Sequence, residues 1–111
     1  MFGTVGKDAL VLTSTTDPPG LSVSGVLDLP DVDAFAHALD EAAARLDGNV
    51  SVDLGGLRAA CTEGLLAMVR VARRLAAQDR KLIARSLSVP QRQLLKLAGW
   101  DRTPGLIVAD Q

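Results

Sequence analysis

The sequence predicts an α/β domain in which three main helices pack on a mixed sheet of four to five strands, in the order β-β-α-β-α-β-α-β. Several short runs alternate apolar and polar residues, as strands with one buried face do. Longer segments between them repeat apolar residues every three to four positions, which is typical of amphipathic helices. Strands joined through a helix run parallel if they pair, so only the first two strands should form an antiparallel hairpin.

Length and composition indicate one soluble domain, which we expect to span residues 1–111. The chain has 111 residues, and dividing it would leave pieces too small for separate cores. Two Phe, one Trp and no Tyr predict an aliphatic core. Because we find neither a signal peptide nor an apolar run of about 20 residues, we expect a cytoplasmic protein that does not enter a membrane.

The first two strands are expected at residues 9–13 and 21–27, where apolar and polar residues alternate. Turn-forming residues fill 15–20 between them. Pro18 and Pro19 should exclude both strand and helix there, so the hairpin should have a longer loop.

The first helix is expected to begin after Asp31 as its N-cap and to run to about Leu46. Gly48 is suited to a left-handed cap that ends it. The apolar stripe expected to face the sheet is Phe35, Leu39, Ala42 and Leu46.

The central segment predicts a strand over 50–54, a tight exit at Gly55–Gly56 and a second helix over about 62–78. Glu63, Arg70 and Arg74 should lie on its exposed face. Its buried stripe is expected to be Leu65, Val69, Ala72 and Ala76, flanked by Met68 and Leu75.

The last third predicts a strand over 81–85, a helix opened by Ser88 and ended by Gly99, and a final strand over 106–109. A proline soon after Ser88 suits a first helical turn. We expect this helix to bury Leu94, Leu95 and Ala98.

Thr62 is the most informative candidate, because it combines a hydroxyl with the start of a helix. As an N-cap, its oxygen would accept from unpaired amides of the first turn. The same amides and the helix dipole favour a phosphate group. Two interpretations stay open: a plain structural cap, or a regulated hydroxyl whose phosphorylation adds about −1.5 to −2 charges to a docking surface.

The remaining reactive residues favour no catalytic or metal site. His37 is the single histidine and is expected on a solvated face. Cys61 is the single cysteine, which leaves a small buried thiol or a weak nucleophile at a helix N-terminus as alternatives. We expect no metal, no cofactor and no enzymatic activity.

The charges are unevenly distributed along the chain. Residues 1–57 carry two of the 12 Lys and Arg side chains but nine of the 13 Asp and Glu side chains. The basic second half is typical either of a polyanion-binding face or of solvated Arg-rich helices. Because there is no base-reading motif and aromatic residues are scarce, we expect no nucleic-acid partner.

Four segments together resemble the STAS domain of anti-sigma factor antagonists. Residues 25–28 (GVLD) resemble that family's strand end before the first helix, and residues 50–57 (VSVDLGGL) resemble its central strand. Residues 61–65 (CTEGL) fall on its Asp-Ser-Ser/Thr-Gly-Leu motif. Residues 89–100, ending in LKLAGW, are similar to its third helix.

The resemblance implies a binding protein that docks on an anti-sigma factor with a serine kinase fold. The kinase would phosphorylate the acceptor hydroxyl, which falls on Thr62, and a phosphatase would reverse the reaction. The sequence departs from the motif because Cys61 replaces its Asp, Thr62 its acceptor Ser and Glu63 its second hydroxyl. The docking surface would comprise Asp28, Arg58, Cys61, Thr62, Glu63 and Gly64.

Three functional hypotheses follow. The first is a phosphorylation-controlled anti-sigma factor antagonist, present as a monomer or weak homodimer. The second is a degenerate STAS adaptor that docks constitutively on a transporter ATPase or a sensor complex. The third is an enzyme that depends on Cys61 alone.

Overall fold

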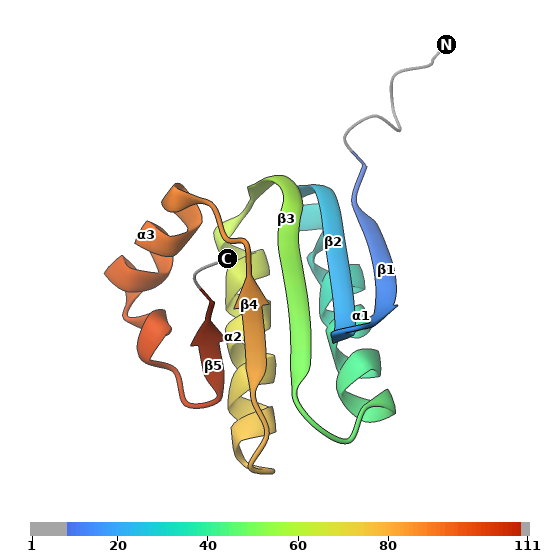
Figure 1. Ribbon diagram of the computed structural model, residues 1–111. Helices are drawn as coiled ribbons and strands as arrows, with labels where there is room; N and C mark the ends of the chain where they lie inside the picture. Colours follow the sequence, from blue (N-terminus) through green and yellow to red (C-terminus); the bar gives the residue numbers. More distant parts are fainter. Residues whose placement is uncertain (1–8, 110–111) are drawn as a thin grey trace.

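A computed structural model describes residues 9–109, so the ends of the predicted 1–111 domain lie outside the described residues. The sheet has the order β1-β2-β3-β4-β5 (Figure 1). Its strands are β1 (Val11–Thr16), β2 (Pro19–Leu27), β3 (Val50–Ala60), β4 (Leu82–Arg85) and β5 (Leu106–Val108). The helices are α1 (Val32–Arg45), α2 (Thr62–Ala76) and α3 (Val89–Ala98), with the short 3-10 helices η2 (Leu29–Asp31) and η3 (Trp100–Arg102).

The predicted mixed sheet is confirmed. β1 pairs antiparallel with β2, and every later neighbouring pair is parallel. Figure 1 shows α1 and α2 together on one face of the sheet, with α3 beside β4 and β5. Since a helix follows each of β2, β3 and β4, the three helices begin at the carboxyl edge of the sheet.

The core lies between the sheet and these helices and is aliphatic, as expected. Among residues 9–109, Phe35 is the one buried aromatic side chain. The β2 and β3 side chains that face the helices are fully buried, and so are Leu39 and Met68. Within residues 9–109, no helix has both the length and the apolarity to cross a lipid bilayer.

The hairpin loop is shorter than expected, and Pro19 lies in a strand. β1 runs from Val11 to Thr16 rather than over 9–13, and Thr16 pairs with Pro19. Only Asp17 and Pro18 remain as the turn. A proline is tolerated as the first residue of a strand, which is where Pro19 stands.

The prediction that β3 ends at Leu54 and exits through Gly55–Gly56 is wrong. β3 continues to Ala60, because β2 remains beside it and supplies backbone partners through two register shifts. Gly56 pairs with Ser24, and a Cβ at Gly56 would lie 2.6 Å from Cβ of Ser24. The glycine therefore permits close strand approach instead of forming a turn.

The end of α1 also differs from expectation, because Gly48 has no left-handed conformation. The helix ends at Arg45, and its last carbonyls accept hydrogen bonds from a distant side chain. The Arg80 guanidinium donates to the carbonyl oxygens of Ala43, Leu46 and Gly48 at 2.9, 2.6 and 2.8 Å. A cation from the turn after α2 thus satisfies the C-terminus of α1.

Two other helix ends show which capping predictions hold. The Asp31 side chain forms no cap on α1, which contradicts the prediction. α3 begins after Ser88 and ends at Gly99, as predicted. Ser88 forms a reciprocal capping box with Gln91, and Gly99 adopts a left-handed conformation. Ala98 is exposed rather than buried, and Ala76 of α2 is only partly buried.

Candidate docking surface

The candidate site lies where β2 and β3 end side by side at the carboxyl edge of the sheet. Leu27 pairs with Ala60, the last residue of β3. The Cys61 amide then donates to the Leu27 carbonyl oxygen over 2.9 Å. This contact brings Asp28, which follows β2, next to the residues that open α2. Two segments more than 30 residues apart in the sequence thereby form one surface.

The N-cap of α2 is Cys61, so the prediction that Thr62 caps this helix is wrong. Cys61 has extended dihedral angles (φ −72°, ψ 160°), and its carbonyl accepts from the amides of Gly64 and Leu65 at 3.1 and 3.3 Å. Its thiol makes no capping hydrogen bond. Thr62 is already the first helical residue, one position too late for its oxygen to cap the first turn.

Thr62 is exposed at this first helical position. Within residues 9–109, its hydroxyl takes part in no hydrogen bond. The first amides of a helix lack intrahelical partners, and the amides of Gly64 and Leu65 already donate to Cys61. The Thr62 and Glu63 amides therefore remain at the helix terminus beside an accessible hydroxyl.

Gly64 brings the start of α2 into contact with the end of β2. A Cβ at this position would lie 2.5 Å from Cδ2 and 2.8 Å from Cγ of Leu27, which is itself 1% exposed. Only glycine lets the helix lie this close to the strand. The packing fixes where the first turn, and with it Thr62, sits relative to Asp28.

Asp28 is exposed and caps η2. Its carboxylate accepts from the Leu29 amide at 3.0 Å, and the Asp31 carboxylate accepts from the Asp28 amide at 3.3 Å. This reciprocal box explains why the Asp31 side chain does not cap α1. Asp28 therefore orders the entry to α1 and adds a negative charge beside the α2 terminus.

The other two predicted residues lie on opposite sides of α2. Arg58, Ser88, Pro90 and Leu94 line a groove of about 270 Å³ between the end of β3 and α3. Glu63 lines a different groove, of about 390 Å³, between α1 and α2. The structure thus brings Asp28, Cys61, Thr62 and Gly64 together, with Arg58 and Glu63 flanking them in separate hollows.

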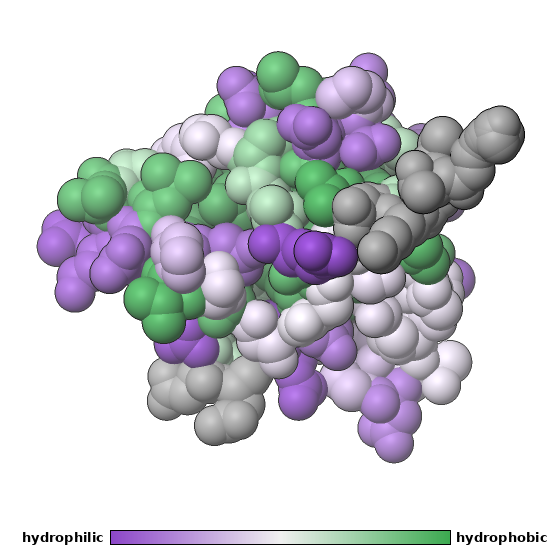
Figure 2. Space-filling view, turned by 90° about the horizontal axis from the view of Figure 1, so that it is seen from above, coloured by the Kyte–Doolittle hydropathy of each residue, from purple (hydrophilic) through white to green (hydrophobic). Residues whose placement is uncertain are grey.

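Sequence reasoning missed the exposed apolar residues on both sides of this cluster. Leu29 of η2 is 59% exposed and Val89 of α3 is 66% exposed. Each precedes an exposed proline in the first turn of its helix, so Leu-Pro and Val-Pro were the available sequence clues. Figure 2 looks down on this edge and shows apolar surface across its middle and over the α3 side. Such apolar surface with polar residues around it is typical of protein docking sites.

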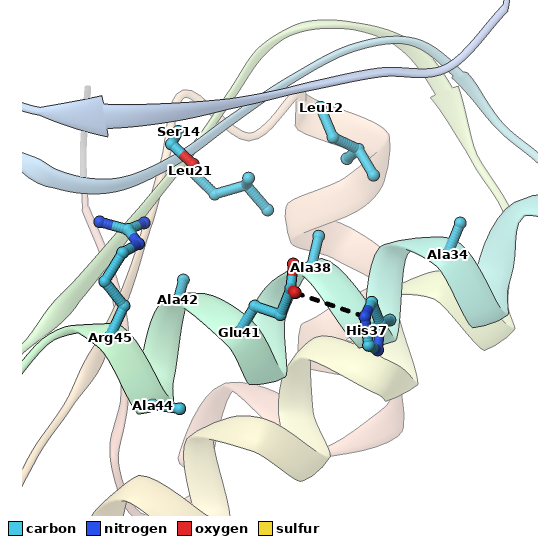
Figure 3. A pocket seen from close by; sticks show the side chains of 10 residues that line it. All are labelled: Leu12, Ser14, Leu21, Ala34, His37, Ala38, Glu41, Ala42, Ala44 and Arg45. Atoms are coloured by element: carbon cyan, nitrogen blue, oxygen red, sulfur yellow. Dashed lines mark ion pairs between the residues drawn. The ribbon is translucent and has the colours of Figure 1, made fainter.

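The two other reactive residues considered from the sequence are His37 and Cys61. His37 is exposed, and its Nε2 lies 3.5 Å from Oε2 of Glu41 (Figure 3). This pair borders a hollow of about 730 Å³ between β1 and α1, whose helix side is formed largely by alanines. Cys61 is a free, partly buried thiol. In the described part of the chain, no three His, Cys, Asp or Glu side chains are grouped as metal ligands.

The charge asymmetry is partly balanced within the fold, where α1 packs beside α2. Nη2 of Arg74 donates to Oδ1 of Asp40 at 2.5 Å, joining the basic half of the chain to the acidic half. Asp33 of α1 and Arg70 of α2 likewise line one groove. The Arg-rich face of α2 thus lies against an acidic helix, which favours the interpretation of solvated, mutually neutralising helices.

Comparisons with known proteins agree with this architecture. Residues 10–109 match the sequence profile of the family described as "Mlab, STAS domain". A comparison with curated proteins found no match. An anti-sigma factor antagonist from Mycobacterium paratuberculosis superimposes with a TM-score of 0.69 at 21% identity, over 92% of this chain and 86% of that chain.

Two further solved structures share the fold. The anti-sigma factor antagonist SpoIIAA in its unphosphorylated form gives a TM-score of 0.65 at 17% identity, over 91% of this chain and 89% of that chain. A Thermotoga maritima protein gives a TM-score of 0.68 at 10% identity, over 91% of this chain and 87% of that chain. At these identities the structures establish a shared fold, while the profile match covers nearly the whole sequence. This chain belongs to the STAS domain family.

Proposed function

We propose that this STAS domain is an anti-sigma factor antagonist in a bacterial partner-switching system that regulates transcription. It acts in the cytoplasm as a binding protein, not as an enzyme. Its partner is an anti-sigma factor with a serine kinase fold. The observation that carries the proposal is the exposed, unbonded Thr62 hydroxyl at the first position of α2, on the same edge of the sheet as Asp28 and the exposed Leu29 that follows it.

The proposed switch is electrostatic. Unmodified Thr62 is compatible with a partner surface packed over the α2 terminus. Phosphorylation adds about −1.5 to −2 charges at that point. Asp28 and Glu63 already place two carboxylates near the same terminus, so the added charge repels an acidic partner surface and must be desolvated against an apolar one. A phosphatase would restore the binding form.

The comparisons support the general role in this proposal, that of an anti-sigma factor antagonist. Two solved structures of the same fold are described as anti-sigma factor antagonists. Thr62 falls on the acceptor position of the Asp-Ser-Ser/Thr-Gly-Leu motif, and the exposure of its hydroxyl is what a kinase substrate requires.

The test measures phosphate transfer and binding on the same full chain. Candidate anti-sigma kinases from the host are incubated with the protein and ATP, and intact mass and peptide mapping locate any phosphate. We expect one phosphate on Thr62. In binding assays, Thr62→Glu should weaken the complex at least tenfold, about 1.4 kcal/mol, whereas the uncharged matched variant Thr62→Gln should not. A Thr62→Glu protein that binds as tightly as wild type would overturn the charge switch.

A second candidate function is a constitutive STAS adaptor on a transporter ATPase or a sensor complex. Two residues at the α2 terminus favour it. Cys61 stands where the motif has Asp, and exposed Glu63 places a permanent negative charge next to Thr62. A stable complex with a partner that lacks a kinase fold, and no phosphate on Thr62, would establish this alternative. An enzyme acting through Cys61 would require that thiol to be alkylated faster than an ordinary free cysteine.

A further inference from the structure

The outer face of α3 exposes apolar side chains that the fold does not cover. Leu97 is 86% exposed and Val89 is 66% exposed, the two highest values among the large hydrophobic residues of the described chain. At about 100° per residue, Val89, Leu97 and Pro90 fall within one arc of the helix. Gln91 and Leu95, which are buried, lie on the opposite side. The exposed polar residue Gln93 falls between Val89 and Leu97 on this arc. An isolated exposed leucine is ordinary, but three exposed apolar residues grouped on one side of a helix are typical of a docking face.

This arc borders a groove. Pro90 and Leu94 form one wall of the hollow of about 270 Å³, and residues 58–60 at the end of β3 form the other. Buried Leu65 contributes to its lining. Figure 2 shows apolar residues on the α3 side of this edge, with polar residues among them, and further apolar surface across its middle. The exposed arc of α3 and the groove beside it together form an apolar strip along the axis of α3. A second helix could pack against such a strip.

The charges around the strip are almost all of one sign. α3 contains Arg92 and Lys96 and no acidic residue. Arg102 follows in η3. From residue 80 to residue 109, Asp101 is the one acidic residue. Lys96 and Arg102, both exposed, therefore give the strip a positive border at its C-terminal end, which complements a negatively charged partner.

We propose that the outer face of α3 and the adjoining groove bind an acidic amphipathic helix of a partner protein. The apolar face of that helix would cover Val89, Leu97 and Leu94. Its Asp and Glu residues would face Lys96 and Arg102. The contact is separate from the Thr62 switch, since Thr62 lies in neither the arc nor the lining of the groove. It would anchor a partner whatever the phosphorylation state.

The experiment uses the full chain, isotopically labelled for NMR, and two synthetic helical peptides. Both peptides carry the same leucine stripe, flanked by Glu in one and by Lys in the other. We expect the Glu peptide to shift resonances of α3 and of residues 58–60, and to bind at least tenfold more tightly than the Lys peptide. Its affinity should fall as salt is added, because screening weakens the charge contacts.

Two matched variants test the location. Leu97→Glu should weaken binding of the Glu peptide at least tenfold. Ala44→Glu, which adds the same charge at an exposed position of α1, should leave it unchanged. Both substitutions are at exposed sites, and circular dichroism verifies the fold. Peptide binding is measured on the unphosphorylated chain, so its outcome does not depend on whether Thr62 acts as a switch.

Several results would overturn the proposal. Equal affinity for the two peptides would contradict the preference for an acidic partner. Resonance shifts confined to residues outside α3 and 58–60 would contradict the proposed location. Failure of the Glu peptide to bind would contradict the whole proposal. Sedimentation showing a wild-type dimer that Leu97→Glu converts to a monomer would identify a second copy of the chain as the occupant instead.

Discussion

Gly64 packs against Leu27 so closely that a Cβ at Gly64 would lie 2.5 Å from Cδ2 of Leu27. This contact joins the first turn of α2 to the end of β2, directly beneath the proposed docking surface. Leu27 is fully enclosed and cannot move aside without disturbing its neighbours. The spacing between Thr62 and Asp28 therefore depends on the lack of a side chain at Gly64.

We predict that Gly64→Ala destabilises the protein by about 1–2 kcal/mol. The gain in helix propensity, about 1 kcal/mol, is smaller than the cost of overpacking against Leu27. The matched control is Gly48→Ala, since a Cβ there would meet no atom within 4 Å. Urea denaturation should place the control within about 0.5 kcal/mol of wild type. Equal stability of the two variants would contradict the packing argument.

Arg80→Ala should destabilise the protein by about 2 kcal/mol, because it leaves the carbonyls at the end of α1 without their charged donor. Arg80→Lys should recover only part of this loss, since a single ammonium group lacks the planar fork that reaches three carbonyls. The control is Arg74→Ala, which removes an exposed pair with Asp40 and should cost less than about 1 kcal/mol. Thermal unfolding that ranks Arg74→Ala as the more damaging change would refute this assignment.

Thr62→Ala should change the free energy of unfolding by no more than about 0.5 kcal/mol, because the Thr62 hydroxyl caps nothing. Ser88→Ala removes a side chain that accepts from the Gln91 amide at 3.3 Å and should cost about 1 kcal/mol. Chemical denaturation of both variants tests the contrast. A cost of about 1 kcal/mol at Thr62 would restore the N-cap interpretation.

Cys61→Asp should stabilise the protein by about 0.5–1 kcal/mol. Cys61 has the backbone conformation of an N-cap, but its side chain makes no hydrogen bond to the amides of the first turn. An aspartate would accept from those amides, and its charge favours the positive end of the helix dipole. Cys61→Ala, which removes the thiol without adding an oxygen, is the control. If calorimetry gives both variants the same midpoint temperature of unfolding, a side-chain oxygen at the N-cap of α2 does not stabilise the protein.

Several features of the fold could be predicted because they depend on local chemistry. The alternation in β2 and the first half of β3, and the helical period of α1 and α2, determined the element order and the mixed sheet. Ser88 with the proline that follows it, and Gly99, marked both ends of α3 in the sequence, since helix starts and stops depend on neighbouring residues. The position of Thr62 at the start of α2 was also visible in the sequence.

The tertiary structure decided what depends on residues that are distant in the sequence. β3 extends past Gly55–Gly56 because β2 supplies backbone partners there. α1 ends without a glycine cap because Arg80 reaches its carbonyls. Asp28 and Cys61 meet because Leu27 pairs with Ala60 and accepts from the Cys61 amide.

The exposed arc of α3 belongs to the same category. The sequence predicted that this helix buries Leu94, Leu95 and Ala98 and made no prediction for Val89 and Leu97, which the placement of the helix leaves facing outward. Local patterning determined which elements form, because capping and periodicity act over a few residues. Contacts between distant segments decided which side chains the docking surface contains, because burial is set by whatever packs on each face.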